Sequence, residues 1–112
     1  MNEKYNVYLI SDSTGETLDR IFIALKAQFP KFECKTIHYS FTRTKNQVDK
    51  IISKSLSEKD VILLYTVVDN ELSKYLQEKA RENNIPNFEV LGNLIGDFSK
   101  LLKQKASRKP SG

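Results

Sequence analysis

A run of hydroxyl, carboxylate and glycine residues follows the first apolar segment of the chain, at residues 6–10. A helical repeat of apolar side chains begins directly after it. Free amides at a helix start, together with the helix dipole, favour a bound anion. The loop therefore predicts a seat for a phosphate group or another part of a substrate. Its residues are Ser11, Asp12, Ser13, Thr14 and Gly15.

Two later loops carry residues that we expect at the same site, namely Arg43, Thr66 and Asp69. Arg43 and Lys45 follow the second predicted strand and would add positive charge. Thr66 and Asp69 lie at the end of the third. An aspartate at the end of two strands, as Asp12 and Asp69 would be, also occurs in phospho-acceptor domains. Those domains need a lysine after a fifth strand, which this pattern does not predict.

Simpler interpretations compete with a functional one. Ser13 and Glu16 have capping-box spacing, so they are expected to cap the first helix. Cys34 and His38 are four residues apart on a predicted strand, which separates them by about 13 Å. They are therefore expected to be a packed thiol and an imidazole at the rim, not a catalytic pair. No Cys, His, Asp or Glu cluster has metal-ligand spacing, so the chain predicts no metal site. No catalytic residue is predicted either.

Composition narrows the possible partners. The chain has 112 residues, 39% hydrophobic and 29% charged, as in globular domains. Five cations and no acid lie in residues 100–112; removing them from the net charge of +4 leaves −1. The basic character thus belongs to the tail, and nucleic acid is not an expected partner. No apolar run approaches the roughly 20 residues of a membrane span. A single cysteine and no apparent leader favour a cytoplasmic protein.

Four apolar segments alternate with four helical patterns. Because the first and third segments are the most apolar, we expect them at the centre of a parallel sheet. The predicted fold is α/β, a four-stranded parallel sheet of order 2-1-3-4 with helices on both faces, flavodoxin-like or Rossmann-like. Thr44 and Gln47 form a second capping box, and Asp69 can cap the third helix. The predicted strands are residues 6–10, 32–39, 61–68 and 87–91.

This fold predicts where a ligand would bind. In such sheets, ligands bind beyond the carboxyl ends of the strands, where the winding reverses. That point lies between the first and third strands, so the turns after residues 10 and 68 should meet there. We expect residues 1–105 to form one α/β domain and residues 106–112 to begin a basic linker.

Four ordered segments resemble the regulatory proteins of bacterial pyruvate, phosphate dikinase and phosphoenolpyruvate synthase, a kinase-pyrophosphorylase family. The most specific is S-D-S-T-G-E-T at residues 11–17. It is followed by F-T-R-T at 41–44, L-Y-T-V-V-D-N-E-L at 64–72, and I-P with V-L at 85–91. The resemblance covers nearly all of residues 5–110, and it identifies the chain with the family's amino-terminal domain.

The resemblance implies a bifunctional serine/threonine kinase and phosphorylase. Such regulators phosphorylate the dikinase or synthase with ADP as donor, and they remove the phosphate with inorganic phosphate. The family's phosphate-cradling loop lies in a second half that this chain lacks, so ADP, ATP and phosphate are cofactors only of the longer protein. We therefore expect a chain that is inactive alone and supports substrate or phosphate binding. Its expected partners are the dikinase or synthase, its own carboxyl-terminal catalytic domain and, in a homodimer, a second copy.

Two other functions stay open. The chain could be a stand-alone binding module for a small phosphorylated ligand, with the same rim but no second domain. It could also be an interaction domain whose exposed edge strand pairs with a partner. Dikinase and synthase cannot be distinguished as targets.

Overall fold

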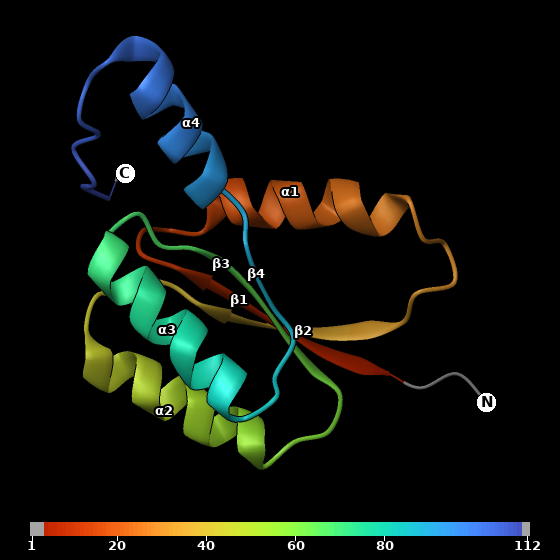
Figure 1. The fold of residues 1–112 in the computed structure, drawn as a ribbon. Helices are drawn as coiled ribbons and strands as arrows, with labels where there is room; N and C mark the ends of the chain where they lie inside the picture. The colour runs from red at the N-terminus through yellow and green to blue at the C-terminus, as the bar shows by residue number, and fades with distance from the viewer. Residues whose placement is uncertain (1–3, 111–112) are drawn as a thin grey trace.

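A computed structural model describes residues 4–110. Its four strands form one parallel sheet of order β2-β1-β3-β4, which confirms the predicted order and fold class (Figure 1). The elements along the chain are β1 (Tyr5–Ser11), α1 (Glu16–Ala27), β2 (Cys34–Tyr39), α2 (Lys45–Leu56), β3 (Val61–Thr66), α3 (Asn70–Glu82), β4 (Asn87–Glu89) and α4 (Gly92–Leu102).

The two central strands are the most deeply buried part of the sheet. Tyr8, Ile10 and Leu63 are 0% exposed, as expected for parallel strands with apolar side chains on both faces. Ser11 pairs with Thr66 at the carboxyl end of the shared ladder. The turns after β1 and β3 therefore lie side by side at one rim, where the sequence places the candidate site.

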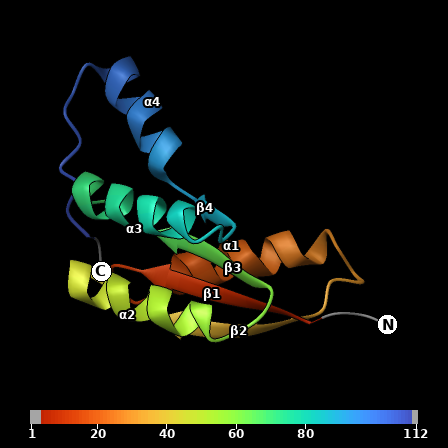
Figure 2. The same ribbon diagram turned by 60° about the horizontal axis from the view of Figure 1, so that its bottom comes forward.

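The two faces of the sheet are covered by different helices and to different extents. α2 and α3 lie on one face and α1 lies on the other (Figure 1). Among the described residues, the core on the α2/α3 face contains 13 buried residues, against five on the α1 face. α4 projects beyond the sheet instead of running along it (Figure 2). No described residue of α4 is buried.

Two helices, α2 and α3, begin at the capping residues that the sequence predicted. Thr44 and Gln47 form the capping box of α2, and the Asp69 carboxylate accepts a hydrogen bond from the Leu72 amide at 2.9 Å at the start of α3. Each side chain satisfies an amide that the helix leaves without a partner.

All four strands differ from their predicted bounds by one or two residues. β1 is Tyr5–Ser11 instead of 6–10, β2 begins at Cys34 instead of residue 32, β3 ends at Thr66 instead of residue 68, and β4 ends at Glu89 instead of residue 91. Phe32 packs against the core without joining the sheet. Its apolar character therefore led the prediction to begin β2 two residues too early. None of the described helices is both long and apolar enough to cross a membrane.

Candidate functional site

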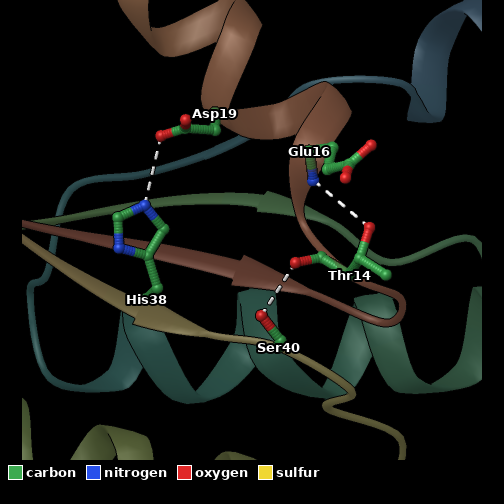
Figure 3. Close-up of polar contacts among 5 residues, drawn as sticks. All are labelled: Thr14, Glu16, Asp19, His38 and Ser40. Carbon is green, nitrogen blue, oxygen red and sulfur yellow. Dashed lines mark hydrogen bonds and ion pairs between the residues drawn. The ribbon is translucent and has the colours of Figure 1, made fainter.

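The loop after β1 is fixed by the loop after β2. The Thr42 amide donates to the Ser11 carbonyl oxygen at 2.9 Å. The Ser40 hydroxyl donates to the Thr14 carbonyl oxygen, also at 2.9 Å (Figure 3). Because these bonds use the backbone of the β1 loop, contacts within the chain itself fix the loop's conformation. The loop is preorganised for whatever binds there.

α1 begins after Gly15, whose backbone is left-handed with φ of +88°. The predicted capping box of Ser13 and Glu16 is wrong: no side chain caps α1, and the Glu16 amide has only a long contact of 3.4 Å to the Thr14 hydroxyl (Figure 3). The left-handed turn carries the chain into the helix without a serine at the cap position. The first turn of α1 therefore keeps weakly bonded amides, as an anion site requires.

Asp12 joins the three loops of the rim. It is 5% exposed, and its Oδ2 accepts a hydrogen bond from the Val68 amide at 2.9 Å. Its own amide donates to the Thr66 carbonyl oxygen at 3.2 Å. Its carbonyl oxygen accepts from Arg43 Nε at 2.8 Å. Asp12 therefore holds β1, β3 and the loop before α2 together, and one of its carboxylate oxygens is occupied in doing so.

A first cavity, of about 300 Å³, opens over the β1 loop. It brings together six of the predicted residues: Ser11, Asp12, Ser13, Thr14, Gly15 and Thr66. The rest of the lining consists of Glu16, Thr17, Leu18, Val68 and Leu91. Hydroxyl groups, backbone amides and the apolar side chains Leu18, Val68 and Leu91 suit a peptide segment, while the carboxylates of Asp12 and Glu16 make this lining acidic.

A second cavity, of about 230 Å³, lies on the other side of Asp12. Arg43 and Asp69 line it, so the structure distributes the predicted residues over two adjoining hollows instead of one. Asp12 lines both. The Asp69 carboxylate is engaged by α3, as described above. Arg43 also lies over the Phe41 ring, 5.4 Å from its centre.

Arg108 in the basic tail reaches this second cavity, which the sequence reasoning missed. Its Nη1 donates to the Val68 carbonyl oxygen at 3.3 Å, and Lys109 and Pro110 line the same hollow. Residues 106–112, of which the last two lie outside the described part, were expected to be a linker. The only available signal was their positive charge, which does not say where a tail folds back. Lys45, by contrast, pairs with Glu71 at 3.3 Å and lines neither cavity.

His38 and Cys34 take no part in the rim cavities. His38 Nε2 lies 3.2 Å from Asp19 Oδ1 on α1 (Figure 3), and Cys34 packs at the edge of the α1-face core. Both partners of the His38 contact are about half exposed, so the pair is a surface contact of little energetic weight. Within residues 4–110, no group of three or more His, Cys, Asp or Glu side chains has the geometry of a metal site.

Fold and site together define a doubly wound α/β domain whose candidate ligand site lies at the reversal point of the sheet. The kinase/pyrophosphorylase family model matches residues 7–112, and the chain belongs to that family.

Three relatives illustrate the match. A protein of Pelagibacter ubique is 56% identical over the whole chain. Proteins of Ehrlichia chaffeensis and Streptococcus uberis are 36% and 33% identical over 89% and 90% of it. All three carry the provisional name of a pyruvate, phosphate dikinase regulatory protein. The chain spans 41%, 37% and 37% of their lengths.

Proposed function

We propose that this chain is the substrate-holding part of a regulator of pyruvate, phosphate dikinase, and that the longer protein transfers the phosphoryl group. The proposed whole-protein reactions are phosphorylation of a dikinase threonine with ADP and removal of that phosphate with inorganic phosphate. Family membership and the names of the relatives support this proposal. The observation that carries it is the preorganised S-D-S-T-G loop, which opens onto the first cavity, while Arg43 lines the second cavity that adjoins it at Asp12.

The described residues account for holding a substrate but not for transfer. Phosphoryl transfer depends on positioning and on neutralising the charge of the moving group. The chain's sequence contains no P-loop. Arg43 can supply charge, and the β1 loop can supply amides and hydroxyls. We therefore expect the target's phosphothreonine segment to lie across the first cavity, with its phosphate directed past Asp12 toward Arg43 in the adjoining second cavity.

Calorimetric titration of the chain with a phosphothreonine peptide from the dikinase tests the proposal. We expect binding that Arg43→Gln weakens about tenfold, the loss of roughly 1.4 kcal/mol of charge-assisted contact. Lys45→Gln is the matched control and should leave affinity unchanged, because Lys45 pairs with Glu71 outside the cavities. Thermal unfolding of both variants shows whether the fold is intact.

Two results would contradict the proposal. One is equal affinity of the Arg43→Gln and Lys45→Gln variants for the peptide. The other is phosphate transfer from labelled ADP to the dikinase by the purified 112-residue chain, which would place catalysis in this domain.

A further inference from the structure

The second cavity combines positive charges from two distant parts of the chain. Arg43 comes from the loop before α2, whereas Arg108 and Lys109 come from the segment after α4. This segment passes the start of α3 (Figure 2), which brings its charges to the rim. Within residues 4–110, none of the three cations forms an ion pair with a carboxylate. Because like charges repel, three unpaired cations around one hollow favour a bound anion.

The two carboxylates that line the second cavity are each engaged by the backbone. Asp12 Oδ2 accepts a hydrogen bond from the Val68 amide, and Asp69 Oδ2 accepts one from the Leu72 amide, each at 2.9 Å. These bonds hold the loops in place and leave the lining with more cations than carboxylates. The first cavity, by contrast, has an acidic lining. An anionic group at this rim is therefore attracted to the second cavity and not to the first.

The two arginines are anchored to the hydrogen-bonded pair of Asp12 and Val68. Arg43 Nε donates to the Asp12 carbonyl oxygen at 2.8 Å, and Arg108 Nη1 donates to the Val68 carbonyl oxygen at 3.3 Å. Each guanidinium makes only this hydrogen bond within the described residues, so most of its N–H donors remain for a ligand. Arg108 also has a left-handed backbone, with φ of 55°, which is unfavourable for a residue other than glycine. Backbone strain of this kind is concentrated at ligand sites.

We propose that Arg43 and Arg108 together bind one phosphate group in the second cavity, so that the segment after α4 forms half of the site. Guanidinium groups recognise phosphate through paired, charge-assisted hydrogen bonds. The cavity volume of about 230 Å³ is below the roughly 300 Å³ at which pockets for drug-sized ligands begin, so its size suits a phosphate group instead of a whole nucleotide. The inference rests on the proposed function for the source of that group, which is either the target's phosphothreonine or inorganic phosphate.

Titration of the 112-residue chain with inorganic phosphate, followed by NMR, tests this site. We expect saturable binding that shifts the Nε–H resonance of Arg108. Arg108→Gln should weaken the binding about tenfold, because one charge-assisted contact is lost. Arg108→Lys keeps the charge but not the planar fork, so it should weaken the binding less. Lys105→Gln removes a charge from the same segment but lies outside both rim cavities. It is the matched control and should leave the affinity unchanged.

The same variants titrated with the phosphothreonine peptide identify the source of the phosphate. If Arg108→Gln weakens peptide binding, the site exists and takes the phosphothreonine. If it weakens only the binding of inorganic phosphate, the site exists for free phosphate.

The proposed site is overturned if Arg108→Gln and Lys105→Gln have equal affinity for both ligands, or if the wild-type chain binds neither. Peptide binding that depends on Arg43 but not on Arg108 would overturn the role of the segment after α4 and leave the proposed function standing. Thermal unfolding of each variant shows whether the fold is intact.

Discussion

The two faces of the sheet are built from the same strands, but the helices bury apolar side chains more completely on one face than on the other. On the α2/α3 face, Leu72, Leu76 and Ala80 of α3 are at most 5% exposed. On the α1 face, Leu25 and Phe29 are 45% and 57% exposed. Apolar side chains therefore meet helices on one face and remain partly in solvent on the other. The difference indicates that the α2/α3 face supplies stability, whereas the α1 face and its rim are available for binding.

Truncating one leucine in each of the two environments should give the largest contrast. Leu76 is 1% exposed, so Leu76→Ala leaves a cavity and should lower the free energy of unfolding by about 2 to 5 kcal/mol. Leu25→Ala should cost less than about 1 kcal/mol, because much of that side chain is already in water. Urea titration of the two variants at low protein concentration measures the difference. Equal losses would mean that the α1 face is covered in solution.

The left-handed turn at Gly15 gives the next largest effect, on the α1 face. A Cβ added there would meet no atom closer than 3.6 Å, so Gly15→Ala should cost only the left-handed backbone, about 1 to 2 kcal/mol. Gly15→Asn is the control and should retain more stability, since asparagine tolerates this conformation better. Urea midpoints check both. If alanine and asparagine destabilise equally, crowding instead of φ explains the glycine.

The α2/α3 face was the easier one to predict from the sequence. Thr44 with Gln47 and the aspartate before α3 are local signals, so two helix starts followed from spacing alone. The start of α1 depends instead on φ at Gly15 and on Ser40 from a distant loop. That tertiary contact explains why the predicted cap at Ser13 was wrong.

The candidate site was also predictable only in part. The rim residues were predicted because the strand order brings the ends of β1 and β3 together. Their distribution over two cavities depends on how the Asp12 carboxylate and Arg43 are hydrogen-bonded. The position of Arg108 depends on the path of the chain after α4. Neither follows from a periodic pattern.

The smallest expected effect is a difference between the two faces in how the free energy of unfolding depends on alkaline pH. Burial, and to a lesser extent the nearby Glu89, raises the pKa of Tyr65 to about 12 from its ordinary value of 10.0; burial also raises the pKa of Tyr8. Both side chains belong to the α2/α3-face core. A raised pKa means that the folded chain keeps a proton that the unfolded chain loses. The free energy of unfolding is therefore unaffected well below pH 10, begins to fall as the pH approaches 10, and continues to fall up to about pH 12.

Tyr65→Phe removes one of these two groups and should make the fall between pH 9.5 and 10.5 shallower by a few tenths of a kcal/mol. Urea midpoints measured across that interval give the slope. Tyr5→Phe is the matched control for the loss of a phenol hydroxyl, because Tyr5 is 37% exposed at the start of β1. An equal change of slope in both variants would mean that the phenol of Tyr65 meets solvent as readily as that of Tyr5, and the α2/α3 face would then be no better closed than its opposite.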